Sequence, residues 1–144
     1  MWLFRTATPR QVDLGLLIAR LALGIVFLAH GGQKLFVFGL AGVTGSFTQM
    51  GIPMPTITAP LVALVEFGGG LALVLGLLTR LAALGIAIDM LGAIFLVHLK
   101  NGFFLPTGYE FALVLCLLAV TLMITGAGAY SLDARIGRRS YAPA

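Results

Sequence analysis

Four long apolar runs, separated by segments richer in glycine, proline and charge, dominate the pattern of this chain. The runs cover residues 14–34, 57–78, 81–99 and 109–127. Each is close to the roughly 20 residues that an α-helix needs to cross the hydrocarbon core of a bilayer. Because helices satisfy their own backbone groups in lipid, the pattern predicts an all-α membrane protein. We expect a bundle of four antiparallel transmembrane helices in one domain, residues 1–144.

The three connections between these runs differ in length and chemistry. The first, "FVFGLAGVTGSFTQMGIPMPTI", is long, and Pro53 and Pro55 stop any helix there. We expect it to form a loop that packs against the bundle or the membrane interface. The second connection is a tight turn at Thr79 and Arg80, and the third is a short loop that begins near Asn101.

Basic residues are distributed unequally between the two sides of the predicted bundle. Cytoplasmic loops of membrane proteins carry an excess of lysine and arginine. We therefore expect both termini to lie in the cytoplasm. Six basic residues fall on the side of the termini and two on the other: Arg5, Arg10, Arg80, Arg135, Arg138 and Arg139 against Lys34 and Lys100.

The composition agrees with a chain surrounded by lipid. Hydrophobic residues make up 60% of it and charged residues only 10%, whereas a soluble domain has about 25% charged residues. The net charge of +4 does not indicate a nucleic-acid partner, because the basic residues gather near the ends of the spans. Cys116 is the only cysteine, so no internal disulfide forms, and its apolar neighbours predict a buried, unreactive thiol.

Three ionisable residues lie deep within the apolar runs, away from their outer ends: Arg20, Glu66 and Asp89. At a rise of about 1.5 Å per residue, Arg20 and Asp89 lie about 9 and 10 Å above the inner edge, and Glu66 about 18 Å. An unpaired charge in mid-membrane costs roughly 3 kcal/mol or more. We therefore expect a buried ion pair between Arg20 and either Asp89 or Glu66. These groups are functional candidates, although a purely structural network is the alternative.

A second set of polar groups lies toward the outer ends of the helices. Counted in the same way, His30 and His98 both fall about 24 Å above the inner edge. At 100° per residue, Arg20, Phe27, His30 and Lys34 share one face of the first helix, so that helix carries a continuous polar stripe. An ordinary exit from the membrane, with snorkelling side chains, is the alternative interpretation. Just above the histidines lie Lys34, Lys100, Asn101, Tyr109 and Glu110.

Helical phase also limits which groups can meet. His98 follows Asp89 by nine residues, which is 900° of rotation and places the two on opposite faces of a regular helix. Both can face the bundle centre only if the helix is distorted, so His30 is the stronger candidate. The stripe on the first helix predicts a pocket that opens toward the outer leaflet. Its floor would be Arg20 and Glu66, and Gly31 and Gly32 would let the outer loop, or Asn101 and Glu110, pack closely over it.

Several motifs along the chain resemble those of the DoxX family of small membrane proteins. They are "ARLALGIVFLAHGGQKLF", "EFGGGLALVLGLLTRLAA" and "NGFF…GYEFALVLCLLAVTLMITGAGAYSLD", and they cover about residues 14 to 134. The resemblance implies a four-helix protein of the bacterial inner membrane that is associated with quinone-linked redox chemistry. One branch of that family supplies the membrane subunit of a thiosulfate:quinone oxidoreductase, and another is linked to oxidative-stress and thiol-defence partners. The motif positions carried over are Arg20, Gly24, Gly31, Lys34, Glu66, Gly69, Gly76, Thr79, Arg80, Asn101, Gly102, Glu110, Gly126, Gly128, Ser131 and Asp133.

Taken with this resemblance, the polar groups predict a quinone site. A quinone needs a flat apolar slot, partners for two carbonyl oxygens and a source of protons. We expect Arg20, His30 and Glu66 to supply hydrogen bonds and protons. The residues expected to bind the ligand are Phe27, Lys34, Gly69, Gly70, Asn101 and Glu110.

The sequence carries no flavin, haem or iron–sulfur motif and no spacing typical of a metal site. We therefore expect electrons to come from a redox partner protein or directly from a bound reductant, so that the chain is a subunit and not a complete enzyme. A non-catalytic scaffold or assembly factor is the alternative, and a transporter of small molecules or lipids is a weaker one. Small residues such as Ala72 and Gly76 also allow a homo-oligomer.

Overall fold

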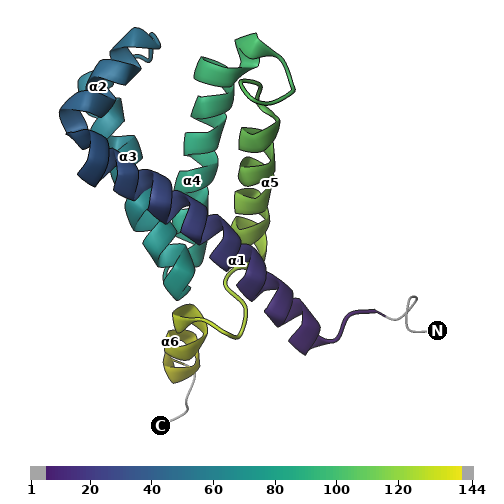
Figure 1. Cartoon of the computed structure of the whole chain (residues 1–144). Coiled ribbons are helices and arrows are strands. Elements are labelled where there is room, and N and C mark those ends of the chain that lie inside the picture. The colour runs from purple at the N-terminus through teal and green to yellow at the C-terminus, as the bar shows by residue number, and fades with distance from the viewer. Residues whose placement is uncertain (1–5, 141–144) are drawn as a thin grey trace.

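All regular secondary structure in the residues described by the computed structural model, which are 6–140 with side chains as far as residue 137, is helical (Figure 1). Arg5 and the side chains of Arg138 and Arg139, which entered the charge count above, lie outside the described residues. The elements are α1 (Pro9–Gly32), the π-helix η2 (Gln33–Phe38), α2 (Gly39–Gln49), α3 (Pro55–Leu75), α4 (Thr79–Ala93), the π-helix η3 (Ile94–His98), the 3-10 helix η4 (Leu99–Asn101), α5 (Glu110–Thr125) and α6 (Leu132–Ser140).

Three helical stretches among the described residues are long and apolar enough to cross a membrane: Pro9–Gln49, Pro55–Leu75 and Thr79–Asn101. The helix α5 is apolar but shorter, with 16 residues. Large hydrophobic side chains cover the outside of the molecule, and Phe36 is 76% exposed. A soluble protein rarely exposes so continuous an apolar surface. The prediction of an all-α membrane protein is therefore confirmed.

The segment between the first two apolar runs is a helix, so the prediction of a loop was wrong. The glycine and threonine residues that suggested turns instead form α2, which continues α1 through η2. Val43 and Phe47, four residues apart, share one face of α2 and pack on Ala59 of α3. This tertiary contact outweighs the weak helix propensity of the segment. Pro53 does lie outside any helix, and Pro55 begins α3.

The helices form two arms joined by α1. In Figure 1, α2 lies beside α3 and α5 beside α4, while α1 runs obliquely across both pairs. The core where the pairs meet is formed by fully buried side chains such as Leu23, Leu73 and Ile86. At the end that carries α6, here called the α6 end, the two pairs lie close together. At the opposite end the ribbons diverge.

Glycines set the close approach of α1 and α3. A Cβ atom at Gly31 would lie 2.2 Å from the Phe67 amide nitrogen, and one at Gly70 would lie 2.3 Å from the Leu28 amide nitrogen. Only glycine fits where two helix backbones touch in this way. Gly31 therefore serves the contact with α3, and the expectation that it admits the outer loop was wrong.

Hydrogen bonds between distant segments close the α6 end. The Asp133 carboxylate accepts bonds from the amides of Leu78 (2.7 Å) and Thr79 (2.9 Å), which caps the start of α4. Asp13 on α1 accepts a bond of 2.9 Å from the amide of Ala129. A carboxylate at a helix N-terminus satisfies free amides and interacts favourably with the helix dipole. The segment after α5 thus binds both α1 and the α3–α4 turn.

Candidate functional site

A cavity of about 510 Å³ lies between the two arms. Its lining comes from α1, η2, α2, α3, α4, η3, α5 and the loop before α5. The walls are mostly apolar, and a few ionisable side chains enter the space. Ligand sites for small organic molecules commonly have this size and this composition. The apolar lining includes Phe27, Val62, Met90, Leu96, Phe111 and Leu115, and the ionisable lining is His30, Lys34, Glu66, Asp89 and His98.

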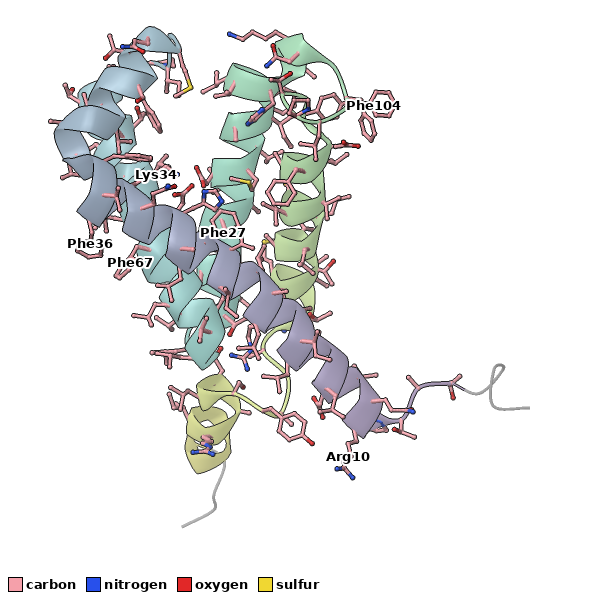
Figure 2. All side chains as sticks on the ribbon, viewed as in Figure 1. Arg10, Phe27, Lys34, Phe36, Phe67 and Phe104 are labelled. Atoms are coloured by element: carbon pink, nitrogen blue, oxygen red, sulfur yellow. The ribbon has the colours of Figure 1, made fainter. Side chains whose placement is uncertain are left out.

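The polar centre of the cavity is an ion pair across two elements. The Lys34 ammonium of η2 donates a hydrogen bond of 2.5 Å to Oε2 of Glu66 on α3. Asp89 of α4 lies against Glu66 and near Lys34. Figure 2 shows Lys34 and Phe27 pointing toward α4, while Phe36 and Phe67 point away from it.

Three elements therefore bring one cation and two carboxyl groups together. The side chain of Glu66 is 6% exposed and that of Lys34 is 20% exposed, so the pair is shielded from water. Two carboxyl groups beside one lysine can accept hydrogen bonds from a ligand and exchange protons with it. Among the described residues, no group of three or more His, Cys, Asp or Glu side chains could hold a metal ion.

A distortion of the third apolar run brings His98 to the same cavity as Asp89. The π-helix η3, Ile94–His98, begins where α4 ends, five residues after Asp89. A π-helix has more residues per turn than an α-helix, so it rotates the residues that follow. Both Asp89 and His98 then line the cavity. The His98 ring is fixed through Nδ1, which lies 2.9 Å from the Thr107 carbonyl oxygen.

Arg20 is not part of this site, and the predicted ion pair with Asp89 or Glu66 was wrong. Its guanidinium donates to the carbonyl oxygens of Leu73 (2.6 Å), Val74 (2.9 Å) and Tyr130 (2.7 Å). These carbonyl groups lie at the α6 end, where α3 finishes. Counting residues misjudged the depth because α1 begins earlier, at Pro9, and crosses the bundle obliquely.

The glycines expected to form a flat slot are not exposed to the cavity. Gly70 contacts Leu28 of α1, and a Cβ atom at Gly69 would lie 3.2 Å from the Ile86 side chain. Both glycines therefore serve helix packing, and neither lines the cavity. Small residues beside a buried carboxylate allow close approach of a helix as readily as that of a ligand.

Two further residues expected to bind the ligand instead shape the loop beside the cavity. Asn101 donates a bond of 3.3 Å from Nδ2 to the Thr107 carbonyl oxygen. Glu110 accepts a bond of 2.8 Å at Oε1 from the Leu105 amide. Neither side chain lines the cavity, whereas Leu105 does. Asn101 and Glu110 thus hold the loop, and the loop bounds the cavity.

Sequence reasoning missed the contribution of α2 to the cavity. Phe47 and Met50 line it, together with Ile52 from the short segment that follows. The available signal was the spacing of Val43 and Phe47, four residues apart, which is typical of one helix face. The glycines and prolines around this pair obscured the signal.

Helices with lipid-facing outer surfaces and an apolar cavity with ionisable groups define a small membrane protein with an internal cavity. Comparison with known proteins agrees with this class. The DoxX family model matches residues 15–99, and the chain belongs to the DoxX family. The resemblance noted in the sequence is thereby confirmed.

Several curated proteins are similar to most of the chain. The "Uncharacterized membrane protein Rv3486" of Mycobacterium tuberculosis is 38% identical over 134 residues, covering 85% of this chain and 82% of that protein. The "Inner membrane protein YqjF" of Escherichia coli is 36% identical, covering 88% and 95%. The "Putative oxidoreductase CatD" of Bacillus subtilis is 32% identical, covering 86% and 88%. No solved structure matches.

Proposed function

We propose that the protein is a quinone-binding membrane subunit of a redox system concerned with oxidative stress or sulfur oxidation. The observation that carries this proposal is the cavity itself, which combines apolar walls with the Lys34–Glu66 ion pair, Asp89 and two histidines. A quinone is a flat apolar ring with two oxygen atoms that need polar partners. The name of the Bacillus subtilis relative, "Putative oxidoreductase CatD", supports the same class of function.

In this proposal the ring lies against Phe27, which is 1% exposed and fixed in the core. Lys34 and His30 serve as hydrogen-bond donors to the ring oxygens, and Glu66 and Asp89 supply or take up protons. A quinone ligand accepts electrons, so a partner protein must deliver them. The residues of this chain bind and orient the ring and manage its protons.

The proposed setting is the bacterial inner membrane, with four spans and both termini in the cytoplasm. The fourth span is α5, whose 16 residues give about 24 Å of helix. That length is somewhat short of the hydrocarbon core, and local thinning of the bilayer accommodates such a difference at modest cost. The α6 end would then face the cytoplasm, and the cavity would open toward the outer leaflet.

The direct test is the quinone content of the purified protein. Protein extracted from bacterial membranes should carry about one quinone per chain after lipid extraction and chromatography. Gly92 lines the cavity, and a Cβ atom there would meet nothing within 4 Å. Gly92→Leu should therefore fill the cavity without disturbing the backbone, and lower the quinone content at least about tenfold.

Gly68→Leu is the matched control, because a Cβ atom at Gly68 also meets nothing within 4 Å and Gly68 does not line the cavity. This variant should keep the quinone content of the unmodified protein. If the unmodified protein carries no more quinone than an unrelated membrane protein, the proposal fails. The scaffold function, with structural buried charges, would then take its place.

A further inference from the structure

Two carboxyl groups from different helices meet at the wall of the cavity. Glu66 of α3 and Asp89 of α4 lie within hydrogen-bonding reach of one another. Carboxylate oxygens only accept hydrogen bonds, so two ionised groups in this position leave their contact without a donor. The Asp89 Oδ2 atom is buried and receives no hydrogen bond from any described residue.

The cations near this pair do not balance its charge. Lys34 of η2 is bonded to Glu66, and a single ammonium group neutralises one of the two carboxylates. The other ionisable side chains on the cavity wall are His30 from α1 and His98 from η3, and α2, α5 and the loop between His98 and α5 add none. His98 is bonded through Nδ1 to the Thr107 carbonyl oxygen. With both carboxyl groups ionised and both rings neutral, the site would hold one uncompensated negative charge in apolar surroundings.

We propose that Glu66 and Asp89 share one exchangeable proton, and that this pair is the proton store of the cavity. A proton between the two groups supplies the missing donor at their contact and brings the set of Lys34, Glu66 and Asp89 to neutrality. Carboxyl groups in contact behave in this way because both cannot ionise at close range. The proton belongs to the pair and is not assigned to one residue.

The use of this proton in chemistry rests on the proposed function. Reduction of a quinone to a quinol consumes two electrons and two protons. The pair would supply one proton: its O–H bond breaks, an O–H bond forms on the ring oxygen, and the pair is left as two carboxylates. The electrons come from the partner protein, and water supplies the second proton and restores the first. The existence of the shared proton, however, does not depend on the identity of the ligand.

Infrared spectroscopy of the protein in lipid nanodiscs near neutral pH tests the proposal. A protonated carboxyl group gives a C=O stretching band that is separate from the carboxylate bands and shifts when H₂O is replaced by D₂O. We expect this band at about one group per chain, and we expect its loss in both Asp89→Asn and Glu66→Gln. The chain has five acidic residues, so the assignment needs a control.

Asp13→Asn is the matched control, because Asp13 accepts the Ala129 amide at the α6 end, outside the cavity. It should leave the band unchanged. A spectrum of the unmodified protein without a protonated carboxyl band overturns the proposal, even if neither cavity variant folds. A band that persists in both cavity variants also overturns it. Quinone content is measured separately, so a missing ligand with the band present would reject the proposed function alone.

Discussion

The Nζ atom of Lys34 lies 2.5 Å from Oε2 of Glu66, and this ion pair joins η2, which follows α1, to the middle of α3. The pair explains why an apolar run should finish with the sequence "HGGQK". His30 and Lys34 line the cavity, and Gly31 between them lets the two helices touch. The stretch thus forms part of the cavity wall, and the helical stretch continues beyond it through η2 and α2.

Removal of the lysine should destabilise the protein. Lys34→Met leaves the Glu66 carboxylate in a shielded position without its cation, and we expect a loss of about 3 kcal/mol. The double variant Lys34→Met with Glu66→Gln should recover part of this loss, because neither charge then remains. Thermal unfolding in detergent measures both effects. Lys100→Met, at an exposed position, is the control and should change little. An equal, small effect at both lysines would contradict the shielded pair.

Arg20 should be essential for stability and not for ligand binding. Its guanidinium donates three hydrogen bonds to backbone carbonyl groups, and bonds from charged donors contribute about 1.5–3 kcal/mol each. Arg20→Met should therefore lower the melting temperature sharply, and Arg20→Lys should only partly restore it because the planar fork is lost. Arg10→Met, at an exposed position on α1, serves for comparison. If Arg20→Met has a normal melting temperature but has lost its quinone, Arg20 takes part in ligand binding and this prediction is wrong.

The contact between α1 and α3 should not accept even one methyl group. Gly70→Ala places a Cβ atom 2.3 Å from the Leu28 amide nitrogen, so the helices must separate. Overpacking of this kind costs about 1–3 kcal/mol. Gly68→Ala, two residues away, meets nothing within 4 Å and should be neutral or slightly stabilising. The yield and melting temperature of the two variants provide the measurement, and equal values would argue against this crossing.

The proposed topology predicts that the two ends of the bundle face opposite sides of the membrane. In a Cys116→Ala background, Asn101→Cys should react with an impermeant thiol reagent added to spheroplasts, whose inner membrane is intact. Gly137→Cys on α6 should react only after the inner membrane is opened. Both positions are exposed. Equal reaction of the two from outside would exclude an arrangement with four spans.

The apolar runs predicted most of the helices because a helix satisfies its own backbone hydrogen-bonding groups in lipid. Residues 57–78 include all of α3 except its first two residues, and residues 109–127 contain α5. Local turn chemistry was misleading in one segment, where Val43 and Phe47 find a tertiary partner in Ala59. Propensity is a weak guide wherever packing supplies the stabilising free energy.

The residues that line the cavity were predicted only where helical phase was sufficient. His30, Lys34 and Phe27 share a face of the first helix, and all three line the cavity. The predicted depth of Arg20 in the membrane was wrong, because a residue count gives depth only for a helix that runs parallel to the membrane normal. Gly69 and Gly70 failed for a different reason: a small side chain indicates close contact, but the sequence does not reveal whether a helix or a ligand makes that contact.

The π-helix η3 makes the polar content of the cavity depend on the winding of the backbone as well as on its residues. A π-bulge corresponds to a single inserted residue within an α-helix. Deletion of Val97 alone, in the middle of the Ile94–His98 segment, would leave His98 eight residues after Asp89, which is 800° or about 80° in a regular α-helix, so both would still face the cavity. The same residues without a deletion, wound as a regular α-helix, would place His98 opposite Asp89, and the cavity would lose one ionisable side chain that the sequence still carries. Relatives that are one residue shorter in this segment are therefore expected to keep the same cavity lining without a π-helix.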